Sequence, residues 1–521
     1  MNLIEDPWIP IRRRSGKEER IAPHQLTEEE DPVMALASPR PDFDGALAQF
    51  LIGLLQTAFP PRDVGEWEDW LEDPPIPEIL QEVFAPWNSA FELDGDGPRF
   101  MQDFVDLDSK PDPIGRLLIE APGANTLRMN ADHFVKRGRS DGLCLSCAVT
   151  ALLTLQLNAP TGGSGHRVSL RGGGPMTTLL VLDPVGADLE PTLWRNLWLN
   201  VLPTREASSL PGNLSLDARQ DIFPWCGPTR TSEPATGTDT TPEDAHPLQM
   251  YWCMPRRIRL HWDEGGGSCS VCNTESEQLV RESETRNYGV NYTGGWRHPL
   301  SPYRQTQEGD WLSLHPQPGG IGYRLWPALV FGDGVIHPAK VIAAFKPRKL
   351  PEEQCRIWAF GYDMNNMKPR CWYETTLPLY HVPEAIREDF ATRVQTLVET
   401  ATEASGYLLR CVKEAWFSRP GDVRGDVSDL SMAFFDRTEA TFFATVGKLA
   451  RAMASQEDRE LLHSWHGVLC NAAMDLFESR VANGDAAFGN PRRVAVARKK
   501  LRNQLHGKKL KSRLVIEKEA A

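Results

Sequence analysis

Two Cys-x-x-Cys pairs are the residues in this sequence best suited to chemistry. The first pair is Cys144 and Cys147, and the second, far downstream, is Cys269 and Cys272. Four thiolates form the ligand set of a tetrahedral structural zinc site, which leaves no coordination position open for water. Each pair also follows a glycine-containing turn. The pattern predicts a structural zinc site, and small buried cysteines are the alternative.

A glycine-rich segment follows the first cysteine pair. Residues 161–174, TGGSGHRVSLRGGG, hold six glycines, with Arg167 and Arg171 between them. Because glycine lets the backbone approach a partner closely, the segment indicates a contact outside the protein, and plain turns are the alternative. The stretch around Ser164 resembles a serine nucleophile elbow, but His166 stands where that motif requires glycine. The sequence has no Walker A or His-Glu-x-x-His pattern, so we do not expect an enzyme.

Composition restricts the class of protein. The chain has 521 residues and a net charge of −13, with 41% hydrophobic and 24% charged residues. These values predict a globular protein of more than one domain, whose acidic surface binds nucleic acid only through local basic patches. No stretch approaches the ~18 apolar residues of a membrane helix, and the N-terminus lacks the regions of a signal peptide. We therefore expect a cytoplasmic protein with reduced cysteines, available for metal.

The elements that must position these residues fall into two parts. We predict an α+β fold with a large mixed α/β domain over residues 1–380 and a four-helix bundle over residues 381–521. Apolar residues repeat helically in four runs, near 384–417, 426–454, 457–482 and 490–512. The last run holds ten Lys and Arg between Arg492 and Arg513 and no acid. This basic run indicates a phosphate contact, and a solvated face is the alternative.

Strands and short helices are expected through the first part. The predicted elements are a hairpin within 2–26, a helix from an N-cap at Asp44 to 58, strands at 176–182 and 250–262, a helix at 191–202, one or two strands within 323–345, and paired strands at 357–365 and 371–380. Residues 204–247, rich in Thr, Ser, Pro and Asp, predict a long exposed insertion. Residues 124–143 predict a loop in which Phe134 and its basic neighbours contact nucleic acid; an ordinary surface loop is the alternative.

Several segments together resemble one known family over nearly the whole chain. They are NLIEDPWIP, SPRPDFDGALAQFLIGLLQTAF, CLSC with NAPTGGSGHRVSLRGGGPMTT, CSVC, GGWRHPLSP and AFGYDMNNMKPR. The family that the segments resemble is that of CasA, the large subunit of the type I-E CRISPR surveillance complex Cascade. The resemblance implies a large mixed α/β domain followed by a four-helix bundle, in agreement with the elements above.

The resemblance also implies a function and partners. It implies a non-catalytic subunit that binds double-stranded target DNA, reads the protospacer-adjacent motif from the minor groove and helps start unwinding. Guide RNA pairing then reads the sequence beyond the motif. The implied partners are the other Cascade subunits, the CRISPR RNA, the target DNA and a helicase–nuclease effector, with no membrane.

Site residues follow from the same resemblance. The glycine loop at residues 161–165 would approach a minor groove only ~6 Å wide. A wedge would lie in the turn 365–368, where Met367 replaces the family's Gln and an apolar side chain inserts between bases. The family's lysine finger falls at Asn287, so the adjacent Arg286 is the expected cation. The Phe134 loop would dock near the guide's 5′ end. The implied DNA-contacting residues are Gly162, Gly163, Gly165, Arg286, Asn366, Met367, Lys368 and Phe134, and the implied structural zinc ligands are Cys144, Cys147, Cys269 and Cys272.

Two other hypotheses stay open on the residues alone. One is a zinc-containing hydrolase that uses Ser164 or a histidine. The other is a scaffold subunit that joins the complex without touching DNA.

Overall fold

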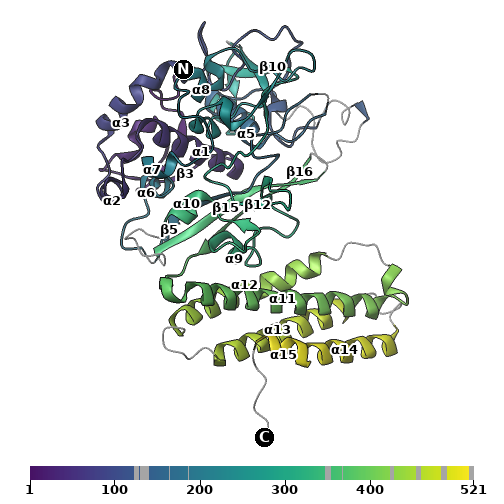
Figure 1. Ribbon diagram of the computed structural model, residues 1–521. Coiled ribbons are helices and arrows are strands. Elements are labelled where there is room, and N and C mark those ends of the chain that lie inside the picture. Colours follow the sequence, from purple (N-terminus) through teal and green to yellow (C-terminus); the bar gives the residue numbers. More distant parts are fainter. Residues whose placement is uncertain are drawn as a thin grey trace. The chain divides into compact units, whose positions relative to one another are not determined.

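The computed structural model describes residues 1–521 except 123–127, 130–139, 164, 186, 264, 346–353, 366–367, 423–427, 453–458, 483–489 and 515–521. It divides into two compact units. The N-terminal unit comprises Met1–Pro316 and Val335–Thr376, and the C-terminal unit comprises Gln317–Gly334 and Leu377–Ala521. Helices and strands are mixed and the C-terminal region is helical, which confirms the predicted α+β class (Figure 1).

The strands of the N-terminal unit form small sheets. The strand orders are β2-β1-β3, β4-β10-β7, β11-β6, β13-β12-β14, β16-β15-β5 and β8-β9. Their bounds are β1 Ile9–Arg13, β2 Glu18–Ile21, β3 Val33–Leu36, β4 Asp112–Pro113, β5 Thr177–Leu182, β6 Asp239–Thr240, β7 Arg257–Asp263, β8 Gly267–Ser268, β9 Glu275–Ser276, β10 Leu279–Arg286, β11 Asn291–Tyr292, β12 Tyr303–Gln305, β13 Trp311–Ser313, β14 Ile336–His337, β15 Cys355–Asn365 and β16 Lys368–Pro378. The predicted paired strands are confirmed as β15 and β16, and β5 lies antiparallel to β15 on its other side.

The N-terminal unit also contains helices. They are α1 Pro41–Ala58, α2 Val64–Glu72, α3 Pro77–Phe84, α5 Leu145–Asn158, α6 Leu193–Trp198, α7 Thr204–Ala207, α8 Arg219–Ile222 and α10 Lys340–Phe345. The predicted N-cap of α1 is wrong, because Arg40 caps the helix and Pro41 occupies its first turn. The Asp44 carboxylate instead accepts hydrogen bonds from the backbone N–H of Ser38 at 2.9 Å and from its hydroxyl at 2.6 Å.

An aromatic cluster forms the centre of the N-terminal unit. The ring of Phe50, on α1, lies 5.2 to 6.0 Å from those of Trp8, Phe91, Phe100 and Trp252. These residues are far apart in the sequence and all are buried. Because edge-to-face contacts add to the free energy of apolar burial, the cluster joins segments that no sheet connects.

The prediction of an exposed insertion at 204–247 is wrong. This segment contains the short helices α7 and α8, and its Phe223 and Trp225 enter the aromatic cluster. The indole N–H of Trp225 donates to the carbonyl of Ala90 at 2.6 Å. The polar residues on both sides of these two aromatic side chains concealed their burial.

Two of the predicted strands also differ. Residues 326–330 and 340–345 are the helices α9 Trp326–Val330 and α10, with only the short strand β14 between them. Pro327 lies in the first turn of α9, where a missing N–H costs no hydrogen bond. The strand expected at 250–262 begins later, as β7, because residues 247–250 form a 3-10 turn.

The C-terminal unit is a helical bundle. Its helices are α11 Arg387–Trp416, α12 Ser428–Ala452, α13 Arg459–Ala482, α14 Pro491–Leu505 and α15 Lys508–Arg513. They run alongside one another (Figure 1). The four predicted helical runs are confirmed, with the last one broken after Leu505 into α14 and α15. None of the described helices is both long and apolar enough to cross a membrane.

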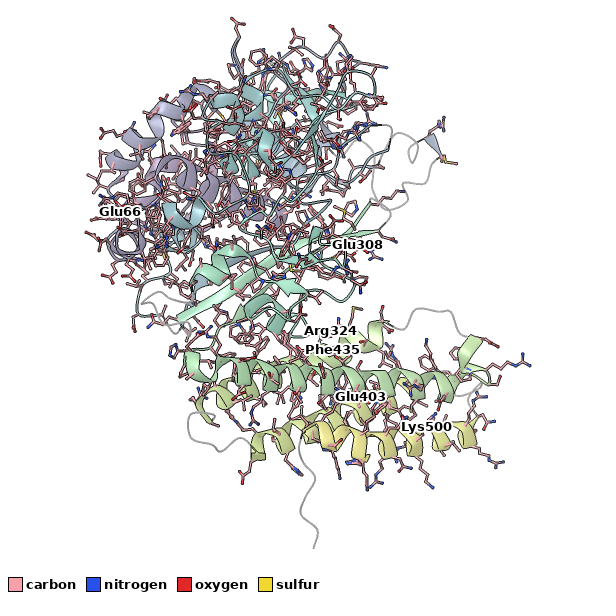
Figure 2. All side chains as sticks on the ribbon, in the orientation of Figure 1. Glu66, Glu308, Arg324, Glu403, Phe435 and Lys500 are labelled. Atoms are coloured by element: carbon pink, nitrogen blue, oxygen red, sulfur yellow. The ribbon has the colours of Figure 1, made fainter. Side chains whose placement is uncertain are left out.

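Residues 317–334 pack with the bundle, although the predicted first domain includes them. The ring of Tyr323 stacks on Phe442 of α12 with 4.2 Å between centroids. The guanidinium of Arg324 lies 4.4 Å from the ring centroid of Phe435 (Figure 2). The C-terminal unit is therefore built from two separate stretches of the chain.

The buried position of Trp225 leads to a stability prediction. We expect Trp225→Ala to lower the free energy of unfolding by about 3–5 kcal/mol, because it removes a large side chain from a close-packed cluster. The substitution should also make residues 204–247 sensitive to limited proteolysis.

Leu214→Ala is the matched control in the same segment, because Leu214 is 55% exposed. It should change stability by less than about 0.5 kcal/mol. Urea unfolding followed by tryptophan fluorescence measures both. Equal effects of the two substitutions would contradict the burial of this segment.

Candidate nucleic-acid interface and cysteine cluster

Helix α5 positions both candidate sites. It begins after its N-cap Cys144 and ends at Asn158, directly before the glycine-rich segment. All of its residues except Leu145 and Leu155 are buried. At 1.5 Å per residue its 14 residues span about 21 Å. The cysteine pair and the glycine loop therefore lie at opposite ends of one rigid element.

The structure brings the four predicted cysteines together. Their sulfur atoms all lie within 4.8 Å of one another, and Cys144 and Cys272 are 3.7 Å apart. All four are free thiols, and three of them are buried. With Zn–S bonds of about 2.3 Å, two sulfurs of a tetrahedral site lie about 3.8 Å apart. The cluster therefore has the donor atoms and the spacing that a four-thiolate metal site requires.

Backbone and side-chain donors surround these sulfurs. The backbone N–H of Cys147 lies near the sulfur of Cys144, and the backbone N–H groups of Cys272 and Cys144 lie near the sulfur of Cys269. Arg20 of β2 donates to Cys144 at 3.5 Å and to Cys272 at 3.7 Å. These donors stabilise negative charge on sulfur, and the sequence analysis missed Arg20 because it lies far from both pairs.

Close packing shifts the pKa values of the thiols in opposite directions. Hydrogen bonds to Cys144 and Cys269, together with burial, raise the pKa of Cys147. A hydrogen bond with Cys147 lowers the pKa of Cys144, but the bond with Cys269 and burial outweigh it and raise this pKa to about 11. Hydrogen bonds from the thiols of Cys144 and Cys147 lower the pKa of Cys269. Because thiolates at this spacing repel one another, the site fits a cation that binds all four sulfurs.

The glycine loop, residues 161–165, follows the end of α5, and its Thr161, Gly162 and Gly163 are exposed. The N–H of His166 donates to the carbonyl of Gly163 at 2.9 Å and closes the turn. Gly163 and Gly165 have φ values of +68° and +84°, which favour glycine. A Cβ at Gly165 would lie 2.6 Å from the ring of Tyr288, whereas a Cβ at Gly163 would meet nothing within 4 Å. Gly163 therefore faces open space at the tip of the loop.

Buried hydrogen bonds hold the base of this loop. The guanidinium of Arg256 donates to the carbonyl of Pro160. The side-chain amide of Gln156 donates to the carbonyls of Met101 at 3.1 Å and Arg256 at 3.0 Å, and its oxygen accepts from the N–H of Arg256 at 3.0 Å. The loop is thus presented by a rigid base.

The two arginines of the glycine-rich segment serve the fold. Arg171 is buried and donates to Thr177 and Ser301, each at 3.0 Å. Arg167 donates to Ser232 at 2.6 Å, and its guanidinium lies 5.8 Å from the ring centroid of Tyr288. The expected outside contact of this segment therefore rests on its backbone and not on its arginines.

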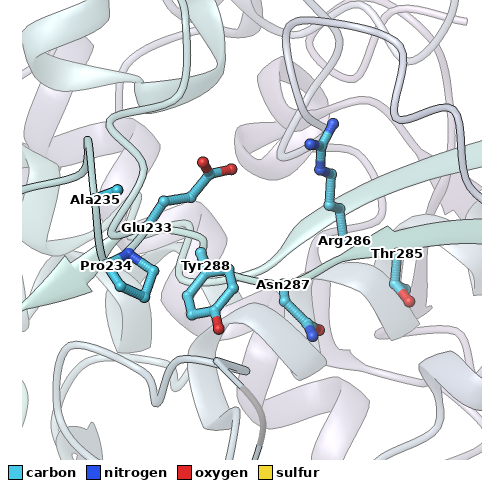
Figure 3. A pocket seen from close by; sticks show the side chains of 7 residues that line it. All are labelled: Glu233, Pro234, Ala235, Thr285, Arg286, Asn287 and Tyr288. Carbon is cyan, nitrogen blue, oxygen red and sulfur yellow. The ribbon is translucent and has the colours of Figure 1, made fainter.

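A pocket of about 590 Å³ adjoins the loop through Tyr288. The N–H of Tyr288 donates to the carbonyl of Gly165 at 2.8 Å. The predicted Arg286 lines the pocket and is exposed. Figure 3 shows Arg286 and Glu233 extending to the same side of this pocket. Tyr288 has a φ of +61°, a strained conformation for a bulky residue of the kind that gathers at functional sites. The sequence did not indicate Tyr288 or Glu233.

The second group of glycines contacts the hairpin of β15 and β16. A Cβ at Gly174 would lie 2.7 Å from Tyr362 and 2.9 Å from Met364, both on β15. Lys368, the first residue of β16, is exposed. The close approach brings the end of the hairpin near the glycine-rich segment. The remaining predicted residues Asn366, Met367, Phe134 and Ser164 lie outside the described residues.

Ion pairs neutralise part of the basic run in α14 and α15. Lys500 pairs with Glu414 at 2.6 Å, and Lys509 and Arg513 pair with Glu403 of α11 at 2.5 and 3.0 Å (Figure 2 labels Lys500 and Glu403). These contacts lie within the C-terminal unit. The run is therefore a weaker phosphate-binding surface than its sequence indicates.

Comparison with known proteins identifies the family. The family model for CRISPR-associated protein Cse1 matches residues 2–476. The chain belongs to the Cse1 family. This confirms the resemblance to CasA that the sequence segments indicated.

Solved structures share this fold. The match to Thermobifida fusca Cse1 has 17% sequence identity and a TM-score of 0.71, and it covers 99% of this chain and 99% of that chain. Thermus thermophilus CasA (Cse1) has 18% identity and a TM-score of 0.69 over 97% of this chain and 99% of that chain. A chain of a CRISPR RNA-guided surveillance complex has 15% identity and a TM-score of 0.65 over 97% of this chain and 99% of that chain. At these identities the similarity shows the fold.

The contact between Gly165 and Tyr288 leads to a second prediction. We expect Gly165→Ala to lower the free energy of unfolding by about 1–3 kcal/mol more than Gly163→Ala. Both positions have positive φ, so both substitutions carry the same backbone cost, and only Gly165→Ala forces the ring of Tyr288 to move. Urea unfolding of the two variants measures the difference. Equal destabilisation would contradict the contact.

Proposed function

We propose that this chain is the non-catalytic large subunit of a type I-E CRISPR RNA-guided surveillance complex. It binds double-stranded target DNA and recognises the protospacer-adjacent motif through the minor groove. It then helps to start unwinding and recruits the helicase–nuclease. Its partners are the other Cascade subunits and the CRISPR RNA.

The observation that carries this proposal is the exposed tip of the glycine loop. Packing inside the protein accounts for Gly165, but nothing lies within 4 Å of the Cβ position of Gly163. A backbone without a side chain, held on a rigid base, is suited to a groove about 6 Å wide. Membership of the Cse1 family makes DNA the expected partner.

Local charge supports the same assignment in an otherwise acidic chain. Arg286 and Lys368 are exposed. Burial lowers the pKa of His166, and the nearby Arg256 and Arg116 lower it further. These guanidinium groups therefore create a positive potential at the loop, which favours phosphate groups. Arg286 would contact the DNA backbone, and the loop would lie in the groove.

Duplex binding by the guide-loaded complex tests the proposal. The complex is assembled with this chain or with Gly163→Asn, and binding is measured on targets with and without the motif. We expect Gly163→Asn to weaken motif-dependent binding at least about tenfold, because its side chain occupies the space that the groove needs. Arg286→Gln should weaken binding to all duplexes and reduce the salt slope by about 1.

Gly16→Asn is the matched control. Gly16 also has positive φ, at +87°, with nothing within 4 Å of its Cβ position, and it lies in the turn between β1 and β2. Asparagine tolerates this conformation, so both variants should fold. Unchanged motif discrimination in Gly163→Asn would contradict groove reading. Equal duplex binding with and without the chain would favour a scaffold role.

We also infer that Cys144, Cys147, Cys269 and Cys272 hold one structural zinc ion. Bound zinc would occupy a closed tetrahedral site, with no position left for a substrate. Through its four sulfur ligands, the ion would link the start of α5 to the turn between β8 and β9. Arg20, which donates to the sulfur of Cys144, would connect β2 to the same site. Its role is to fix the helix that carries the glycine loop.

Metal content tests the zinc assignment. We expect Cys147→Ser to lose about one zinc per chain and to lower the melting temperature, because three ligands bind the ion more weakly than four. Cys371→Ser is the control, since Cys371 is exposed and lies outside the cluster. Elemental analysis and thermal unfolding measure both. Equal zinc content in the two variants would contradict the assignment.

A further inference from the structure

Three metal-binding side chains meet in the C-terminal unit, away from the sites described above. His466 and Cys470 are four residues apart on α13, so their side chains lie on one face of the helix. His506 directly follows the last residue of α14. One donor atom from each of the three lies within 4.8 Å of the others. Two helices thus bring two imidazoles and a thiol to one point.

The end of α14 supplies a fourth donor. The chain turns at His506 and Gly507 before α15 begins, so the carbonyl of Leu505 is one of the acceptors that a helix end leaves without an intrahelical partner. This oxygen lies 2.9 Å from Nε2 of His466 and 3.8 Å from the sulfur of Cys470. The carbonyl therefore points into the group of three side chains.

The nitrogen–sulfur distance matches that of a tetrahedral metal site. Nε2 of His466 lies 3.5 Å from the sulfur of Cys470. Zinc bonds of about 2.0–2.1 Å to nitrogen and about 2.3 Å to sulfur place these two atoms about 3.6 Å apart in a tetrahedron. This pair therefore has tetrahedral spacing without any movement of α13. The 2.9 Å between Nε2 and the carbonyl of Leu505 is a hydrogen-bond distance, which must lengthen to about 3.4 Å when both atoms bind the ion.

Burial and access also suit an ion. His466 and Cys470 are 5% and 4% exposed, so bulk water would compete little for the ion. His506 is exposed and gives the ion a path from solvent. Nitrogen and sulfur donors favour zinc and similar transition metals, whereas calcium and magnesium require a shell of oxygen atoms.

We propose that His466, Cys470, His506 and the carbonyl of Leu505 bind one divalent transition-metal ion of the zinc class. On binding, the Nε2 proton that His466 donates to Leu505 moves to Nδ1 of the same ring, and the Cys470 thiol releases its proton to solvent. The ion links α13 to the junction of α14 and α15. The alternative is a helix cap in which His466 only satisfies the carbonyl of Leu505.

Metal counting on the full chain separates these two roles. The probes are Zn²⁺, measured by elemental analysis after removal of free metal, and Co²⁺, measured by its thiolate absorption. We expect His506→Gln to lose one equivalent relative to the unchanged chain, and added Zn²⁺ to raise the melting temperature of this variant less than that of the unchanged chain. Cys470→Ser should lose the same equivalent together with its share of the cobalt–thiolate band.

His463→Gln is the matched control, because His463 lies exposed on the same helix and outside the group of donors. It should keep the full metal count. Cys147→Ser distinguishes this site from the four-cysteine cluster, because each substitution removes metal only from the site that contains it. The equivalent of metal lost in His506→Gln therefore does not depend on whether the four-cysteine cluster holds zinc. An unchanged metal count in His506→Gln would leave only the helix cap and overturn the proposal.

Discussion

The burial of α5 is the constraint on which both sites of the N-terminal unit depend. Its apolar faces are covered by neighbouring elements, so the helix has no free side along which to shift. Gln156 adds three hydrogen bonds to backbone groups of two other segments. Breaking them would leave buried polar groups unpaired, at a cost of about 1–3 kcal/mol each. The cysteine cluster and the glycine loop therefore keep a constant separation.

The glycines of residues 161–174 have two separate physical roles. At Gly165, Gly173 and Gly174 a Cβ would collide with Tyr288, Pro160 and Tyr362, so internal packing requires glycine there. At Gly163 the space is open, and only the positive φ and an outside partner favour glycine. A single glycine-rich motif thus contains both the base that packs inside the protein and the tip that faces outward.

The arginines are divided in the same way, between buried side chains that serve the fold and exposed side chains that can reach a ligand. Arg257 pairs with Asp103 at 2.6 Å in the interior, and Arg171 is buried among polar side chains. A buried guanidinium requires such partners because desolvation opposes its charge. Exposed cations such as Arg286 remain available to a ligand. A count of arginines in the sequence therefore overstates the charge offered to DNA.

Local periodicity and short motifs were sufficient to predict the α+β class, the four helical runs, the β15–β16 hairpin and the family. The motifs also indicated four cysteines, but their meeting depends on contacts across more than one hundred residues, from Cys144 to Cys272. The folded chain was needed to show that Trp225 is buried, that Arg171 is internal and that Tyr288 packs against Gly165. It also placed His506 beside His466 and Cys470. Burial and long-range contact are properties of packing between distant segments, and no local pattern encodes them.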